Sequence, residues 1–270
     1  MTSLSLLMPA RNSETYIASA LRSVLSQMRD EDEIIVQDCL STDSTINIVR
    51  EIAQNDPRVS ITSEDDSGQS DALNKALARA TGTYVGWLNS DDIVAAGFFS
   101  NFYNAIERID NSSIIIGGHQ TCTADGTVLR TYRAQKLNKR RLLILGCYVF
   151  SGSLFIRRTT LEEMGGFNTD LHFGMDLDLM LRLPKDADSQ TLVHHTAGVL
   201  RLHPGSKTGS GPLRFVGEAS RIRLAYSQTV IDYWLSALGG CLQLASIATT
   251  NVRKSKAYIF ARELTVRPNK

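Results

Sequence analysis

The sequence has little cysteine and no excess of either charge, and both shortages exclude large classes of protein. Its four cysteines in 270 residues are scattered at positions 39, 122, 147 and 241, without a Cys-x-x-Cys pair. This spacing argues against a disulfide framework or a zinc site and is typical of reduced thiols in the cytosol. Lys and Arg number 29 against 28 Asp and Glu. The chain therefore lacks the basic surface that nucleic-acid binding requires, and we expect no nucleic-acid partner.

Long apolar runs and glycine-rich phosphate loops are also missing. No uninterrupted apolar stretch reaches the roughly 18 residues that a membrane-spanning helix needs, and no basic flank precedes a long apolar run at the N-terminus, so we expect no signal peptide. Neither Gly-x-Gly-x-x-Gly nor Gly-Lys-Ser/Thr follows the first predicted strand. A nucleotide bound there would need a metal ion to neutralise its phosphates.

Short apolar segments alternate with amphipathic ones along the first half of the chain. Strands are predicted at 4–8, 33–36, 59–62 and 83–88, and helices at 13–28, from 42 or 43 onward, and at 68–80. Pro9 is expected to end the first strand, Ser13 to cap the first helix, and Gly82 to end the third. Strand alternating with helix predicts a parallel sheet with right-handed crossovers.

The second half of the chain has a more mixed pattern. Strands are predicted at 113–118, 127–132, 149–157 and 191–202, and helices at 95–109, 159–164, 175–183 and from 212 to the end. The absence of repeats and low-complexity linkers favours one compact domain with a helical tail.

Two adjacent acids, Asp91 and Asp92, directly follow the predicted strand at 83–88. Asn12, Asp38 and the segment 64–67 follow other strands of the same sheet, whose carboxyl ends share one edge. One acid of the pair could hold a hard divalent cation while the other faces a sugar hydroxyl. A solvated turn is the alternative, because Asn-Ser-Asp-Asp is also good turn chemistry.

The order and spacing of six segments resemble glycosyltransferase family 2, whose members have the GT-A fold. These segments are 8–12, 38–45, 63–75, 89–92, 165–182 and 201–208. The resemblance implies an α/β fold: a Rossmann-like, mostly parallel sheet with flanking helices, a small antiparallel acceptor-side portion and C-terminal helices. It also implies a GT-A domain over 1–210, with a nucleotide-sugar half at 1–110, an acceptor half at 111–210, and a helical tail at 211–270.

The same resemblance implies an inverting transfer of a sugar from a nucleoside-diphosphate sugar, with a UDP-sugar as the expected donor. Asp92 and His203 would hold Mg²⁺ or Mn²⁺, Asp91 would face the ribose, and Asp176 would act as the base. A carbohydrate or lipid-linked hydroxyl in cell-envelope glycan synthesis would be the acceptor. The nucleotide-sugar site would comprise Pro9, Ala10, Asn12, Asp38, Asp66, Asp71, Asn74, Asp91 and Lys207.

Two departures from the family pattern and two competing classes remain. Met175 precedes Asp176 where the family often has Glu, and Cys39 and Leu40 follow Asp38 where it often has Asp or Gly.

A nucleotidyltransferase on a similar sheet would require a glycine-rich basic loop after the first strand. A non-catalytic nucleotide-sugar binding protein would not require Asp176.

The C-terminal tail carries apolar side chains over 231–247, followed by basic residues at 253, 254 and 256. It could cover the core, serve as a homodimer contact, or lie at a membrane surface. The third possibility would place a cytoplasmic enzyme peripherally at the inner face of the membrane.

Overall fold

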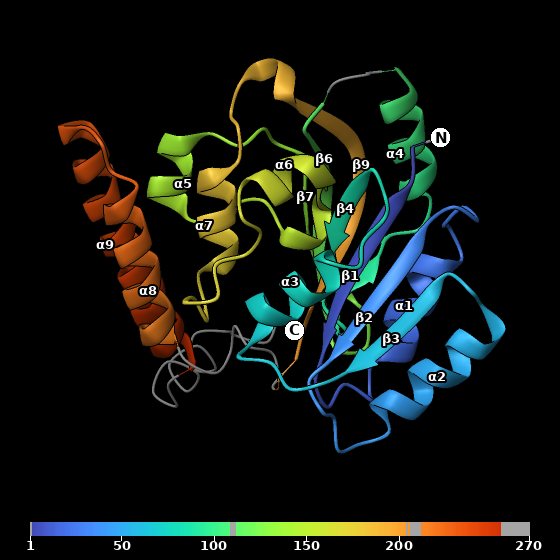
Figure 1. The fold of residues 1–270 in the computed structure, drawn as a ribbon. Coiled ribbons are helices and arrows are strands. Elements are labelled where there is room, and N and C mark those ends of the chain that lie inside the picture. Colours follow the sequence, from blue (N-terminus) through green and yellow to red (C-terminus); the bar gives the residue numbers. More distant parts are fainter. Residues whose placement is uncertain (1, 109–111, 204, 206–211, 255–270) are drawn as a thin grey trace, which may run out of the picture.

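The computed structural model describes residues 2–108, 112–203, 205 and 212–254, and a mixed sheet runs through the middle of these residues (Figure 1). The strand order is β3-β2-β1-β4-β8-β6-β9-β5, with β7 paired to β6 off this path. The strands are β1 (Leu4–Ala10), β2 (Glu33–Asp38), β3 (Val59–Ser63), β4 (Tyr84–Trp87), β5 (Ile93–Val94), β6 (Ile114–Thr123), β7 (Val128–Tyr132), β8 (Leu154–Arg157) and β9 (Gln190–Leu202).

Helices cover both faces of this sheet, because side chains alternate along its strands. On β1, Leu6 packs in a core with Leu21 and Phe98, whereas Leu7 packs in a second core with Leu73 and Leu179. The helices are α1 (Ile17–Leu25), α2 (Thr45–Asn55), α3 (Gln69–Leu77), α4 (Phe98–Arg108), α5 (Lys139–Leu145), α6 (Arg158–Glu163), α7 (Met175–Arg182), α8 (Pro212–Ala225) and α9 (Val230–Lys254). Helices α1, α2 and α4 lie on the first face, and α3, α5, α6, α7 and α8 on the second.

The predicted parallel half of the sheet is confirmed. β2 pairs in parallel with β1 and β3, and β1 pairs in parallel with β4. Beyond β4, the strand β8 is antiparallel to both β4 and β6, while β6 and β9 run parallel to each other. The α/β class with flanking helices and a C-terminal helical pair is therefore as predicted.

The prediction that Pro9 ends the first strand is wrong, because β1 continues to Ala10. The Leu7 carbonyl accepts a hydrogen bond from the Leu88 N–H, so the odd-numbered residues of β1 direct their backbone groups toward β4. The ladder between β1 and β4 stops at the pair of Leu7 and Trp87. Pro9 lies beyond the last pair of this ladder, where a backbone N–H would have no hydrogen-bond partner on β4. A proline at this position therefore costs the sheet no hydrogen bond.

Several predicted boundaries also differ from the structure. Helix α1 begins at Ile17 rather than after Ser13, whose carbonyl accepts a turn hydrogen bond from Tyr16. Gly82 does not end α3, which stops at Leu77; it packs against β1, where a Cβ would lie 2.5 Å from the Ser5 nitrogen. The strand expected at 149–157 begins at residue 154, after the 3₁₀ turn Ser151–Ser153, and helix α5 was not predicted.

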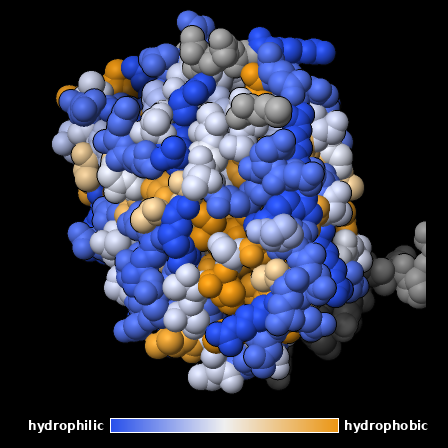
Figure 2. All heavy atoms as spheres, turned by 45° about the vertical axis from the view of Figure 1, so that its right-hand side comes forward, coloured by the Kyte–Doolittle hydropathy of each residue, from blue (hydrophilic) through white to orange (hydrophobic). Residues whose placement is uncertain are grey.

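The C-terminal helices α8 and α9 pack side by side at one end of the molecule, next to α5 (Figure 1). The face of the molecule drawn in Figure 2 is mainly hydrophilic, with apolar atoms in a central area and in smaller patches near the edges. None of the described helices is both long and apolar enough to cross a membrane.

Candidate functional site

The loops after β1 and β2 are tied together by their own polar side chains. Asn12 adopts a left-handed backbone conformation (φ 48°), and its side-chain oxygen accepts from the Thr42 N–H at 2.9 Å. The Asn12 N–H donates to Ser41 Oγ at 2.8 Å. Asp38 is buried and accepts from the Ser41 N–H at 2.9 Å and from Ser63 Oγ at 2.7 Å. The structure thus brings Asn12 and Asp38 to one edge, as predicted, with their oxygens already engaged in shaping it.

The two adjacent acids after β4 have different environments. Asp92 is buried, and its oxygens accept from the Arg201 N–H on β9 at 2.9 Å and from the Asn89 side chain at 3.0 Å. Burial and the neighbouring charge of Asp91 raise the pKa of Asp92 to about 8. Asp91 has 29% of its side chain exposed, and its Oδ2 lies 2.9 Å from Nε2 of His203. Only Asp91 of the pair is open to a ligand.

The Tyr16 ring packs against His203, and the Arg201 guanidinium packs against the Tyr16 ring. The Tyr16 ring lies 4.7 Å from the His203 ring, measured between centroids, and the Arg201 guanidinium lies 4.6 Å from the Tyr16 ring on its face. Arg201 is buried and contacts Ser19 Oγ, while its Nε has no hydrogen-bond partner among the described residues. These contacts fix the end of β9 against α1 and so hold His203 beside Asp91.

Helix α3 connects the Asp91 loop with the start of α7. At its first residue, the Gln69 amide donates to Asn89 Oδ1 at 2.7 Å. At the next residue, Ser70 Oγ lies 3.5 Å from the Met175 sulfur. Asp176 follows Met175, so the N-terminus of α3 contacts both the loop of the two acids and the turn of α7 that carries the predicted base.

Asp176 lies in the first turn of α7 and is half-buried. Its Oδ1 accepts from the Leu177 N–H at 2.8 Å. The Cys147 thiol faces it: burial, followed by the negative charge of Asp176 and a hydrogen bond to it, raises the thiol pKa well above its ordinary value. Asp176 therefore lies next to a thiol that is uncharged at neutral pH.

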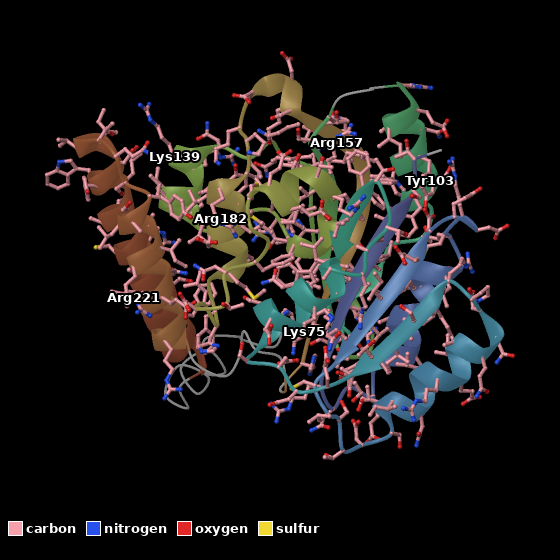
Figure 3. All side chains as sticks on the ribbon, viewed as in Figure 1. Lys75, Tyr103, Lys139, Arg157, Arg182 and Arg221 are labelled. Carbon is pink, nitrogen blue, oxygen red and sulfur yellow. The ribbon has the colours of Figure 1, made fainter. Side chains whose placement is uncertain are left out.

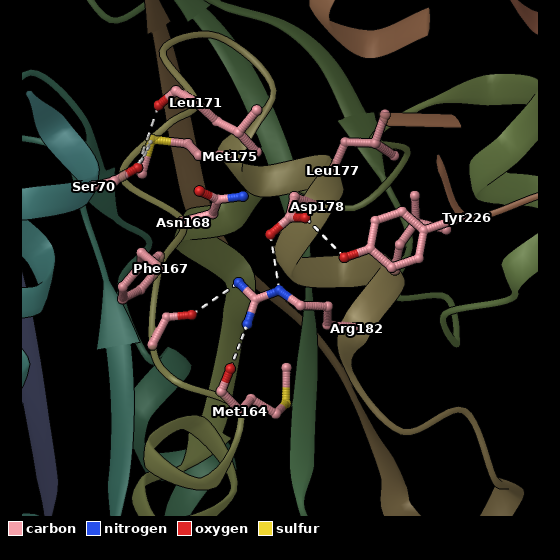
Figure 4. Close-up of polar contacts among 12 residues, drawn as sticks. Ser70, Met164, Phe167, Asn168, Leu171, Met175, Leu177, Asp178, Arg182 and Tyr226 are labelled. Carbon is pink, nitrogen blue, oxygen red and sulfur yellow. Dashed lines mark hydrogen bonds and ion pairs between the residues drawn. The ribbon is translucent and has the colours of Figure 1, made fainter. Parts of the chain in front are cut away.

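Asp178, two residues later, has a structural role (Figure 4). It forms an ion pair with Arg182 at 2.8 Å and accepts from the Tyr226 hydroxyl at 2.9 Å. Arg182 also donates to the carbonyls of Met164 and Gly166. This network joins α7 to α8 and to the glycine turn after α6.

The predicted nucleotide-sugar residues around α3 differ in their roles. Asp66 Oδ1 accepts from the Gly68 N–H at 3.0 Å, and Asp71 pairs with Lys75 at 3.5 Å. The Asn74 amide is occupied at both ends, since it donates to and accepts from the Phe167 backbone at 2.8 Å each. The structure therefore gives Asn74 a clamping role between α3 and the acceptor-side loop.

Pro9 and Ala10 lie at the end of β1 beside the same edge. Lys207 lies outside the described residues, so its predicted role in the site stays a prediction. Among the residues described, no three His, Cys, Asp or Glu side chains form a ready metal cluster. Any ion at Asp91 and His203 would take its other ligands from elsewhere.

A buried carboxylate on α8 supports the loop before α7, and the sequence reasoning missed it. One oxygen of Glu218 accepts from the backbone N–H groups of His172, Phe173 and Gly174 at 2.9, 3.1 and 3.1 Å. The side chain is 5% exposed. In the sequence, Glu218 stands out only as the single acid of a basic and apolar helix. That pattern does not identify its hydrogen-bond partners, which lie 44 to 46 residues away.

Two solved structures with sugar nucleotides bound share this fold. Residues 1–349 of TarS from S. aureus, in complex with UDP-GlcNAc, match with a TM-score of 0.66 and 20% identity over 98% of this chain and 76% of that one. The mannosyltransferase PcManGT from Pyrobaculum calidifontis, in complex with GDP-Man and Mn²⁺, matches with a TM-score of 0.58 and 18% identity over 95% and 82%. The architecture is that of GT-A enzymes, which transfer sugars.

The family model described as "Glycosyl transferase family 2" matches residues 5–165, which is more than half of the sequence. This chain belongs to glycosyltransferase family 2. The match confirms the predicted family over the nucleotidyltransferase alternative.

Curated relatives share this region and are much longer. An uncharacterised glycosyltransferase of Rickettsia felis is 28% identical over 188 residues, covering 66% of this chain and 31% of its own length. A chondroitin synthase of Pasteurella multocida is 26% identical over 180 residues, covering 66% of this chain and 18% of its own. The chain thus spans less than a third of either relative.

Proposed function

We propose that this chain moves a sugar from a nucleoside-diphosphate sugar, with UDP as the nucleotide, to a hydroxyl of a carbohydrate or lipid-linked acceptor in cell-envelope glycan synthesis. The main support is that the N-terminus of α3 contacts both the loop that carries Asp91, through Gln69 and Asn89, and the residue before Asp176, through Ser70 and Met175. TarS bound to UDP-GlcNAc and a polysaccharide synthase among the relatives support this donor and product class.

We revise the predicted roles of the two acids. Asp91, rather than Asp92, is our metal ligand, because it is partly exposed and lies against His203, whereas both oxygens of Asp92 are engaged inside the protein. A carboxylate oxygen suits Mg²⁺ or Mn²⁺, which commonly keep substrate phosphate and water as further ligands, and the imidazole nitrogen favours Mn²⁺ of the two. When bound, such an ion would neutralise charge on the departing diphosphate. Asp92 then holds the turn after β4 against β9.

Asp176 is our base. As the acceptor oxygen bonds to the anomeric carbon, its proton passes to Asp176, and the bond from that carbon to the diphosphate oxygen breaks with its electron pair leaving on the diphosphate. Attack opposite the leaving group inverts the anomeric configuration. The N-terminus of α7 favours the ionised carboxylate that this step needs. The Cys147 thiol, which burial keeps protonated, can donate a weak hydrogen bond to this carboxylate.

The remaining donor contacts are proposed for the edge formed by β1, β2 and α3. Asn12, Asp38, Asp66 and Asp71 shape that edge, and the exposed backbone of the loops they hold is available to the nucleotide. We keep the division into a donor half at 1–110, an acceptor half at 111–210 and a helical tail within the proposal, with the enzyme acting at the cytoplasmic face of a membrane.

The direct test is release of nucleoside diphosphate from a donor panel with Mn²⁺, Mg²⁺ or chelator present. UDP-GlcNAc, UDP-glucose and UDP-glucuronate are compared with GDP-mannose. We expect metal-dependent UDP release that Asp91→Asn and His203→Gln each reduce by about two orders of magnitude, as metal-site substitutions do. Glu51→Gln, an exposed acid on α2, is the matched control. Unchanged UDP release by the Asp91 variant would overturn the assignment.

A further inference from the structure

The outer face of α9 is apolar where a helix at a water-exposed surface should be polar. Across Val230–Ser246, the stretch of α9 whose side chains are described, Asp232 is the one charged residue, and it is buried and paired with Lys139 at 3.3 Å. Trp234 is 74% exposed. The other exposed large apolar side chains of this face are Val230, Ile231, Tyr233, Leu238, Leu242 and Leu244.

This clustering is specific to one end of the molecule. Nine of the thirteen large hydrophobic side chains exposed among the described residues belong to α5, α8 and α9, counting Leu145 and Leu224 with the seven on α9. Scattered single apolar residues need no explanation, but a contiguous apolar face marks an interaction surface. The exposed apolar side chains of α9 run from Val230 to Leu244, which is about 22 Å of helix, so the surface is extended.

The two glycines of α9 do not interrupt this face. Gly239 is buried, and a Cβ there would lie 2.4 Å from the Leu143 carbonyl oxygen at the end of α5. Glycine at this point allows α5 to pack closely against the inner side of α9. The apolar outer face therefore continues from Val230 past the glycine pair.

The charges beside the face are all of one sign. The sequences of α5, α8 and α9 contain two acids, Glu218 and Asp232, and both are buried. The cations of α5 and α8 are the other charged groups of this region, and Figure 3 shows Lys139 and Arg221 next to the α8–α9 pair. The exposed arginines of these two helices are Arg140, Arg141, Arg214 and Arg221.

We infer that α9 docks on a bilayer surface rich in anionic lipid, with its apolar face among the acyl chains and the arginines of α5 and α8 at the headgroups. Apolar and aromatic side chains bordered by cations are what an interfacial helix presents to such a surface. A second copy of the chain is disfavoured as the occupant, because a two-fold contact would bring the like-charged borders together. The inference stands on this face and does not depend on the proposed donor or acceptor.

Vesicle flotation of the 270-residue chain tests the docking. Vesicles of phosphatidylcholine alone are compared with vesicles in which about a third of the lipid is phosphatidylglycerol, at low and high salt. We expect the protein to float with the anionic vesicles and to be partly released by salt. Trp234→Glu with Leu238→Glu should lower the bound fraction at least about tenfold. The double variant Arg140→Glu with Arg221→Glu should lower binding to the anionic vesicles and leave binding to the phosphatidylcholine vesicles unchanged.

Leu129→Glu is the matched control, since Leu129 is 56% exposed on β7, away from α9. It should float like the wild type. Thermal unfolding and UDP release measured without vesicles should be the same for all four proteins, which separates loss of docking from loss of the fold or of the proposed activity.

Three results would overturn the inference. One is a wild-type protein that stays at the bottom with both kinds of vesicle, and another is equal flotation of the Trp234 double variant. The third is a dimeric wild-type protein and a monomeric Trp234 double variant in sedimentation velocity. This result would mean that a second copy of the chain covers the apolar face.

Discussion

Removing the Glu218 carboxylate tests how the loop before α7 is held. This side chain accepts from the three consecutive N–H groups of His172, Phe173 and Gly174, directly before the helix that carries Asp176. The hydrogen bond to Gly174 is buried, and the other two are partly buried. In Glu218→Ala, the buried donor loses its partner at about 1–3 kcal/mol, and the other two lose about 1 kcal/mol each. We expect about 3–5 kcal/mol of lost stability in urea unfolding.

The conservative variant distinguishes geometry from charge. Glu218→Gln keeps an acceptor oxygen, so we expect roughly half of that loss. At a temperature where all variants are folded, kcat for UDP release should fall in Glu218→Ala while KM for the donor changes little, because the donor edge lies at β1 to β4. Glu218→Gln should recover some of the lost kcat. Glu162→Ala, which breaks a solvent-exposed ion pair with Arg158, should cost less than about 1 kcal/mol.

A Glu218→Ala protein within about 1 kcal/mol of the wild type would refute this reasoning. So would equal losses for the Gln and Ala variants. A donor KM that rises in step with the fall in kcat would show that the loop supports the donor rather than Asp176.

Three further predictions concern the framework of the site. Asp178→Ala leaves the Arg182 guanidinium without its ion pair, and calorimetry should show a loss of about 2–4 kcal/mol; a change below about 1 kcal/mol would contradict the network. Gly82→Ala places a methyl group 2.5 Å from the Ser5 nitrogen, and urea unfolding should show a loss of about 1–3 kcal/mol rather than the gain usual for Gly→Ala in loops. Burial lowers the pKa of His119 from 6.5 to about 4. As the pH drops, the unfolded chain binds a proton at His119 before the folded chain does. The free energy of unfolding should therefore fall by up to about 3 kcal/mol between pH 6.5 and about 4, and His119→Phe should flatten this dependence. Identical pH profiles of the two proteins would contradict it.

The repeating elements of the fold could be predicted because their signals are local. Apolar runs bounded by turn formers identified β1 to β4, and their alternation with amphipathic helices predicted the parallel pairing. Boundaries failed where a distant partner decides them. Pro9 continues β1 because β4 has already ended, and Gly82 serves close packing against Ser5 rather than a helix end.

The candidate site was predicted as a set of residues but not in their orientation. Which of Asp91 and Asp92 faces outward depends on the Arg201 N–H, 109 residues away from Asp92, which fixes the buried acid. The partner of Asn74 is a backbone 93 residues away, and that of Glu218 lies at the start of another helix. Such contacts leave no periodic or local signal in a single sequence.

The central claim, that Asp176 is the base of a sugar transfer from a donor held at Asp91 and His203, is tested most directly by measuring UDP binding and UDP release on one variant. In calorimetry, Asp176→Asn should bind UDP in the presence of Mn²⁺ as tightly as the wild type does. Its rate of UDP release in the presence of an acceptor should fall by at least about two orders of magnitude. Asp170→Asn, an exposed acid in the loop before α7, should match the wild type in both measurements. Release by Asp176→Asn at the wild-type rate would contradict the account.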